Sequence, residues 1–262
     1  MDLNLTGKKA LVCGASQGLG LASAIELSLL GASVTIVSRS AEKLQAALQQ
    51  MDASRGQQHA FIAVDFSDHH ALQEKMEEYV KKHPSVHILV NNTGGPPGGP
   101  ALTASIEAFE NGMQMHLFCA QVLVQALVPG MKKEGYGRII NIISTSVKQP
   151  IPGLGVSNTV RAAMASWSKT LAGELGRFGI TVNNVLPGYT ETDRLDYVLG
   201  QKAKQSGTDL AQEKEKAAAE IPAGRIGQPN EFGAAVAFLC TPAAAYINGI
   251  NLPVDGGKLG CL

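Results

Sequence analysis

Three glycines stand close together near the start of the chain, in the run GASQGLG at residues 14–20. Backbone without Cβ atoms can turn sharply and approach a phosphate, and the unpaired N–H groups at the start of a helix attract an anion. The run therefore predicts a binding loop for the diphosphate of a dinucleotide. A tight turn that binds nothing is the alternative. The predicted contacts are Gly14, Ser16, Gln17, Gly18, Leu19 and Gly20.

A second group of polar residues indicates which dinucleotide would bind. About 20 residues after the glycines, an NAD site places Asp or Glu against the ribose 2′-hydroxyl. Here the chain reads Ser38, Arg39 and Ser40. Arg39 can pair with a 2′-phosphate, and either serine can donate a hydrogen bond to it. We therefore predict NADP(H) in preference to NAD(H), unless Arg39 merely begins an exposed helix.

The composition limits the classes of partner. The 262 residues are 45% hydrophobic and 17% charged, and 22 Lys and Arg balance 22 Asp and Glu. This balance gives no electrostatic reason to expect nucleic acid or an anionic membrane surface. We see neither a signal peptide nor a run of about 18 apolar residues that could cross a bilayer. The expectation is a soluble cytoplasmic protein.

The cysteines show no pattern that would bind a metal. Cys13, Cys119, Cys240 and Cys261 are widely scattered and lack metal-ligand spacing. We expect buried reduced thiols and no metal site.

The elements that must position these residues alternate along the chain. Several strand candidates are almost wholly apolar, as in parallel strands that are covered on both faces. The strand candidates are Ala10–Cys13, Ser33–Ser38, Ala60–Asp65, His87–Asn91, Arg138–Ser144, Thr181–Leu186 and Asn251–Val254, and helix-length segments between them include Leu19–Leu30, Ala41–Gln50, Asp68–Lys82 and Asn158–Phe178. The alternation predicts one α/β domain over residues 1–262. Its expected architecture is a Rossmann-type, doubly wound parallel sheet of about seven strands in a three-layer αβα sandwich.

Residues 189–224 interrupt this alternation. The segment is polar and charge-rich from Asp193 to Gly224, and it follows a predicted strand. Ligands of open α/β sheets bind beyond the carboxyl ends of strands. We expect surface helical turns that form a substrate lid, or else a solvated insertion.

The glycine spacing GxxxGxG resembles that of the short-chain dehydrogenase/reductase family. Residues 91–94 (NNTG) are similar to the family's NNAG motif, and residues 187–192 (PGYTET) to its PG turn and nicotinamide-contacting threonine. Residues 225–229 and 254–257 are similar to its C-terminal signatures. The resemblance implies cofactor contacts at Asp65, Asn91, Thr93, Gly94, Pro187, Gly188, Thr190 and Thr192, with Asp65 facing the adenine.

The resemblance is weakest at the family's catalytic Asn-Ser-Tyr-Lys tetrad. Ser144 stands at the Ser position, but Ser157 occupies the Tyr position and Arg161 the Lys position. The Asn position falls on His116, with one residue of uncertainty. A serine hydroxyl is a far weaker acid than a tyrosine hydroxyl. Arg161 can still bind ribose hydroxyls, but it stays protonated and cannot relay a proton.

Two functions follow from these substitutions. In the first, the protein is an NADP-dependent oxidoreductase that reduces a small-molecule carbonyl, resembling 3-oxoacyl carrier-protein reductases, with a non-standard proton donor. His116, which titrates near neutrality, Lys148 and Tyr189 are candidates. Each also has a purely structural interpretation: His116 as a hydrogen-bonded helix residue, Lys148 as a surface charge and Tyr189 as a packing residue. In the second, the protein binds NADP(H) without catalysis, as a sensor or partner subunit.

The expected quaternary structure also comes from the family. Apolar helical surfaces at residues 117–127 and 162–175 suit either core packing or contact between subunits. Because the family commonly forms tetramers, we expect a homodimer or homotetramer.

Overall fold

The computed structural model describes residues 1–261 and contains one parallel sheet. Its seven strands lie in the order β3-β2-β1-β4-β5-β6-β7. The strands are β1 (Lys9–Cys13), β2 (Ser33–Ser38), β3 (Ala60–Ala63), β4 (Ile88–Asn91), β5 (Gly137–Ile142), β6 (Ile180–Pro187) and β7 (Asn251–Val254). The order reverses between β1 and β4. In open α/β sheets, this switch point is where a ligand crevice forms.

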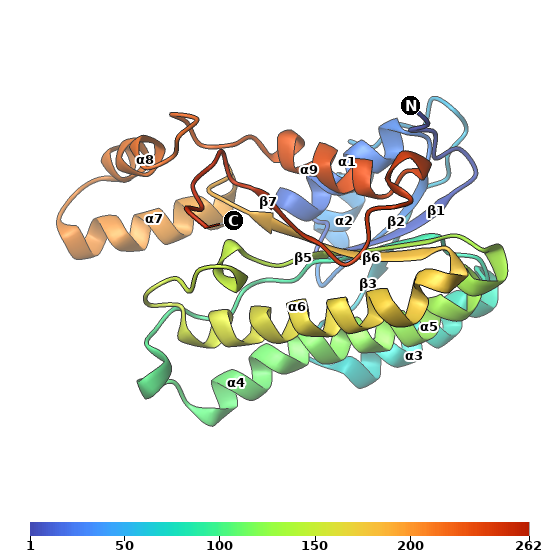
Figure 1. Cartoon of the computed structure of the whole chain (residues 1–262), viewed down its shortest axis with the longest axis horizontal. Helices are drawn as coiled ribbons and strands as arrows, with labels where there is room; N and C mark the ends of the chain where they lie inside the picture. Colours follow the sequence, from blue (N-terminus) through green and yellow to red (C-terminus); the bar gives the residue numbers. More distant parts are fainter. Residues whose placement is uncertain (262) are drawn as a thin grey trace.

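Helices cover both faces of the sheet and complete the expected three layers (Figure 1). On one face lie α1 (Gly18–Leu29), α2 (Ala41–Leu48) and α9 (Pro229–Leu239). On the other lie α3 (His69–Lys82), α4 (Ile106–Met113), α5 (Cys119–Glu134) and α6 (Gly155–Leu175). Separate apolar cores fill the two spaces between helices and sheet. The Rossmann-type fold is therefore confirmed.

Two strands end earlier than the sequence predicts, because side chains start turns there. β3 ends at Ala63, and Oδ1 of Asp65 accepts the backbone N–H of Ser67 at 2.9 Å. β5 ends at Ile142, and Oγ of Ser144 accepts the N–H of Ser146 at 3.0 Å. Short polar side chains compete for backbone donors in this way. As a result, Asp65 and Ser144 lie on loops beyond their strands.

An internal row of amides links four neighbouring strands. The strand register aligns Asn91 with Asn141, Asn141 with Asn184, and Asn184 with Asn251. Their side chains bond in sequence, at 2.7, 3.1 and 2.8 Å. Since buried polar groups are costly without partners, this row favours one strand register.

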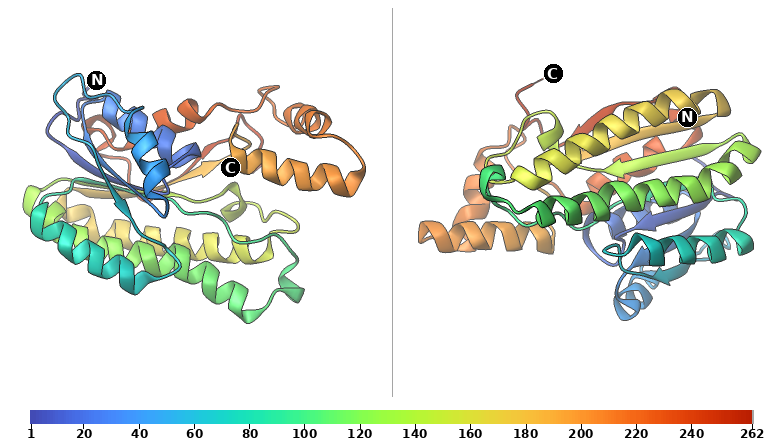
Figure 2. Two further views of the ribbon diagram at one scale, coloured as in Figure 1. Left: turned by 180° about the vertical axis from the view of Figure 1, so that it is seen from behind. Right: turned by 90° about the horizontal axis from the view of Figure 1, so that it is seen from below.

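Residues 189–224 form two helices, α7 (Asp193–Ser206) and α8 (Leu210–Ala219). They project beyond the carboxyl ends of the strands (Figure 2). A small cluster of their own, including Leu199 and Ala217, holds them together. The segment lies at the end of the sheet where a substrate lid is expected. Its opening and closing over a substrate remain a prediction.

None of the helices within residues 1–261 is long and apolar enough to cross a membrane. Cys13, Cys119 and Cys240 are buried, but Cys261 is exposed, so the expectation of burial was wrong for this cysteine. It lies next to the end of the chain, outside both cores.

Candidate active site

A cleft of about 1330 Å³ opens at the carboxyl ends of the strands. Most small-molecule pockets measure about 300–1,000 Å³, so this cleft has room for a dinucleotide and a second molecule. The residues predicted from the sequence that line it are Gly14, Ser16, Gln17, Gly18, Leu19, Ser38, Arg39, Ser40, Asp65, Thr93, Gly94, Ser144, Ser157, Arg161, Pro187, Gly188, Thr190 and Thr192. Gly20, Asn91, His116 and Lys148 are not among the lining residues.

The glycine loop is held against the end of β4. Gly14 has a φ of +58°, a conformation that side chains disfavour. Nδ2 of Asn92 donates to the carbonyl oxygen of Gly14 at 3.1 Å. A Cβ on Gly20 would collide with that same oxygen. Gly20 therefore allows the loop to close on the side away from the cleft. The N-terminus of α1 at Gly18 faces the cleft.

The far end of the cleft carries two cations. Nη1 of Arg39 lies 3.9 Å from Oδ2 of Asp65, and both side chains are largely exposed. Lys43, in the first turn of α2, lines the same space and donates to Oε1 of Gln17 at 3.1 Å. Exposed ion pairs of this kind contribute only about 0–1 kcal/mol. A phosphate group could therefore draw Arg39 away from Asp65 at small cost.

Two serine hydroxyls lie at the opposite end. Ser144 begins a single 3-10 turn, η3 (Thr145–Val147), and Ser157 lies in the first turn of α6. Both are half-buried and line the cleft. Because Ser157 lines the cleft, its Oγ is available to a ligand.

Arg161 is buried beside these serines without a carboxylate partner. Nη1 donates to the carbonyl oxygen of Ile142 at 2.9 Å, and Nε has no partner among the described residues. Burial, and secondarily the charge of Arg194, lowers the pKa of Arg161 to about 10. The side chain therefore remains a cation at neutral pH. An isolated buried charge is costly unless a ligand pairs with it.

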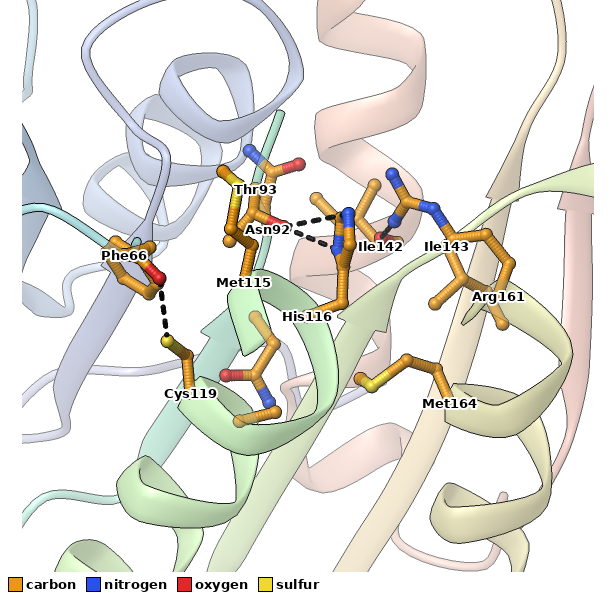
Figure 3. Close-up of a pocket in the computed structure, with 12 residues that line it drawn as sticks. Phe66, Asn92, Thr93, Met115, His116, Cys119, Ile142, Ile143, Arg161 and Met164 are labelled. Atoms are coloured by element: carbon orange, nitrogen blue, oxygen red, sulfur yellow. Dashed lines mark hydrogen bonds between the residues drawn. The ribbon is translucent and has the colours of Figure 1, made fainter. Parts of the chain in front are cut away.

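His116 lies in a five-residue π-helical turn, η2 (Gln114–Phe118), which precedes α5. Its Nδ1 and Oγ1 of Thr93 lie 2.5 Å apart (Figure 3). The ring lines a separate cavity of about 10 Å³, room for one water molecule. Burial, and then the charge of Arg161, lowers the pKa of His116 well below its ordinary value, against a smaller opposite effect of the backbone at Gly94. The prediction that His116 titrates near neutrality was therefore wrong.

Three further predicted residues have other surroundings. The side chain of Asn91 belongs to the amide row across the sheet. Lys148 is half-buried and ends η3, outside the cleft lining. Tyr189 does line the cleft, and Nζ of Lys258 lies 5.0 Å from the centre of its ring.

Sequence reasoning missed three residues of the cleft. Asn92 belongs to the NNTG motif, whose sequence does not reveal that this side chain holds the glycine loop. Lys43 lies in the first turn of α2, four residues after Arg39 in the sequence, and a second cation so near Arg39 could have indicated it. Arg194 lines the cleft from α7. Nothing in its charge-rich surroundings distinguishes it.

The residues present fit a dinucleotide. Glycine at positions 14 and 20 lets the loop pack against Asn92 without a collision, and the helix N-terminus at Gly18, where a Cβ would stand 3.7 Å from the side chain of Thr192, suits a diphosphate. Arg39 and the unpartnered Nε of Arg161 stand at opposite ends of one cleft. One end suits a 2′-phosphate, and the other suits the reactive part of the cofactor.

Known proteins resemble this chain over almost its whole length. The family model described as enoyl-(acyl carrier protein) reductase matches residues 14–258. The 3-oxoacyl-(acyl-carrier-protein) reductase FabG of Vibrio cholerae is 33% identical over 256 residues, which cover 97% of this chain and 98% of that protein. The L-sorbose reductase of Gluconobacter frateurii, solved with NADPH and L-sorbose, is 31% identical with a TM-score of 0.93 over 100% of both chains. YwfH, an NADPH-dependent reductase involved in bacilysin biosynthesis, is 27% identical with a TM-score of 0.92, over 97% of this chain and 99% of that one. The chain belongs to the short-chain dehydrogenase/reductase family.

Proposed function

We propose that the protein is an NADP-dependent oxidoreductase that transfers a hydride between NADPH and a carbonyl or alcohol substrate. One observation carries the proposal. A single cleft joins the glycine loop and Arg39 at one end to Ser144, Ser157 and Arg161 at the other. Relatives named as reductases and dehydrogenases support the reaction class.

The preference for NADP(H) rests on the cations beyond β2. Arg39 and Lys43 line the cleft where the adenosine ribose would lie, and Ser40 caps α2 there. Two positive charges favour a 2′-phosphate over a 2′-hydroxyl. Asp65 faces the same space, but its exposed pair with Arg39 is weak. Two structural relatives are described with NADPH, which agrees with this preference.

The reacting end of the cleft offers hydrogen bonds and charge. When bound, the cofactor supplies a hydride to the carbonyl carbon. The hydroxyls of Ser144 and Ser157 donate hydrogen bonds to the carbonyl oxygen, which becomes more basic as negative charge develops on it. The buried cation of Arg161 adds a positive electrostatic potential at this end of the cleft.

The proton that completes the alcohol comes from Oγ of Ser157, and cleft water returns it. An alkoxide is basic enough to accept a proton from a serine hydroxyl, although no neighbouring base or acid assists the transfer. His116 carries no proton to give as an imidazolium at neutral pH, because its pKa is lowered. Losing the assistance of a tuned acid costs about 10²–10⁴ in rate.

The test measures turnover of NADPH with a panel of activated ketones, diketones and quinones, repeated with NADH. We expect slow turnover that prefers NADPH. The variant Ser157→Tyr combined with Arg161→Lys should raise kcat by about 10²–10⁴, the range typical of positioned proton transfer. Tight NADPH binding without turnover of any substrate, in both proteins, would reject the reductase proposal.

Tight NADPH binding without turnover would instead indicate the alternative function, an NADP(H)-binding sensor or partner subunit. The observation that favours it is the pair Ser157 and Arg161, neither of which is a tuned acid. A sensor would bind NADPH tightly and change its stability or association on binding, with no product formed.

A further inference from the structure

Two arginines in the cleft have no anionic partner. Within the described residues, neither Arg161 nor Arg194 forms an ion pair with a carboxylate. The carboxylates that line the cleft are bonded elsewhere: Asp65 to Arg39, Asp193 to Gln17, Glu220 to Lys258, and Asp255 to the backbone of Gly257 and Leu259. The two guanidinium groups are therefore the uncompensated charges at this end of the cleft.

The arginines reach the same space from different elements. Arg161 extends from α6 and Arg194 from the first turn of α7. A Cβ placed on Gly95 would lie 3.8 Å from Nη2 of Arg161 and 3.8 Å from Nη2 of Arg194. Because both nitrogen atoms lie 3.8 Å from the same point, the distance between them is at most twice 3.8 Å. With N–H···O distances of about 2.9 Å, one carboxylate can accept from both.

Burial makes this arrangement unfavourable without a ligand. Arg161 is 8% exposed, and its Nε has no partner in the part of the chain that the structure describes. Figure 3 shows its guanidinium beside the imidazole of His116, which is neutral and does not compensate the charge. Burial, and then the charge of Arg194, lower the pKa of Arg161, so the second arginine adds repulsion to the cost of burial. An anion between the two guanidinium groups would remove both costs.

Building on the proposed function, we propose that Arg161 and Arg194 together bind an anionic group of the carbonyl substrate, so that the substrate is an oxo acid. Its carboxylate lies over Gly95, and its carbonyl oxygen faces Ser144 and Ser157.

The diphosphate of the cofactor is the other anion that could occupy this place. The structure gives it a separate site at the N-terminus of α1, where Gly18 and Leu19 line the cleft. Arg161 instead bonds to Ile142 at the end of β5, two residues before Ser144. Its position beside the serines favours the substrate.

The test compares three oxo acids, pyruvate, acetoacetate and levulinate, with their methyl esters. We expect the wild-type protein to have a kcat/KM for at least one acid that is about ten-fold or more above that of its ester. The exposed variant Arg194→Gln should lose that difference, mainly through KM, while kcat/KM for the ester stays within roughly two-fold. The control Arg177→Gln removes an exposed arginine that does not line the cleft and should keep the difference.

Two further measurements separate the possible outcomes. The Kd of NADPH should not change in Arg194→Gln; a rise of about ten-fold would assign the pair to the diphosphate and overturn the proposal. If neither these compounds nor the panel of activated ketones, diketones and quinones turns over, the proposed function fails by itself. Calorimetry of the same acids and esters with the NADPH complex still decides the inference. Binding of an acid but not its ester, lost in Arg194→Gln, supports it, and equal or absent binding of all acids and esters rejects it.

Discussion

The proposed preference for NADPH rests on single exposed cations, Arg39 and Lys43. Replacing Arg39 with Gln should raise the Kd of NADPH by about ten-fold, since one charge-assisted contact with the 2′-phosphate is lost. The Kd of NADH should stay nearly constant. Lys43→Gln should show the same selectivity with a smaller effect. Fluorescence titration of both nucleotides checks this, and equal losses for NADPH and NADH would contradict the assignment of Arg39.

His116 provides a second prediction for one residue. Its pKa is lowered in the folded protein, so protonating the ring opposes folding. As pH falls below about 6.5, the ordinary pKa of histidine, the unfolded chain binds the proton first and the folded state loses stability. The variant His116→Gln should lose this part of the pH dependence. Urea unfolding at several pH values measures it, with NMR titration of the ring as a direct check.

Among the elements, α7 and α8 are joined by a carboxylate. The nearly buried Glu213 of α8 bonds Lys216 at 2.8 Å and Thr208 at 2.8 Å, and pairs with Lys202 of α7 at 3.2 Å. These contacts, led by the hydrogen bond from Lys216, lower its pKa from 4.5 to about 2. They tie together the two helices that stand beyond the cleft.

The sign of the pH effect follows from that lowered pKa. The folded state favours the charged carboxylate, so its stabilisation is complete above 4.5 and disappears as pH falls toward about 2. Glu213→Gln should expose residues 193–219 to faster hydrogen exchange at neutral pH, with a difference from wild type that shrinks as the pH falls through this range. A constant difference would show that the charge of Glu213 does not hold α7 to α8.

For the whole molecule, we predict self-association. Large apolar side chains remain exposed on the described chain, with Leu102 at 95%, Ile106 at 73% and Tyr246 fully exposed. Apolar surface of this kind, if contiguous, marks interaction sites. Light scattering should give the mass of a homodimer or homotetramer, and Ile106→Glu should reduce that mass if α4 lies in the contact. A monomer at all concentrations would contradict the prediction.

Local sequence pattern was sufficient for the fold and one end of the cleft. Apolar runs alternating with helical segments predict a parallel sheet, and the glycines at 14, 18 and 20 serve backbone geometry that neighbouring residues set. The ends of β3 and β5 were misplaced because the side chains of Asp65 and Ser144 start turns. The hydrophobic periodicity of the sequence carries no information about single hydrogen bonds of this kind.

The other end of the cleft was decided by tertiary structure. The amide row from Asn91 to Asn251 exists only because strand register brings four distant residues into line. The low pKa of His116 requires its burial beside Arg161, and the meeting of Arg161 with Arg194 over Gly95 requires α6, α7 and β4 to converge. Charge and burial depend on distances through space, and these become fixed only when the chain has folded.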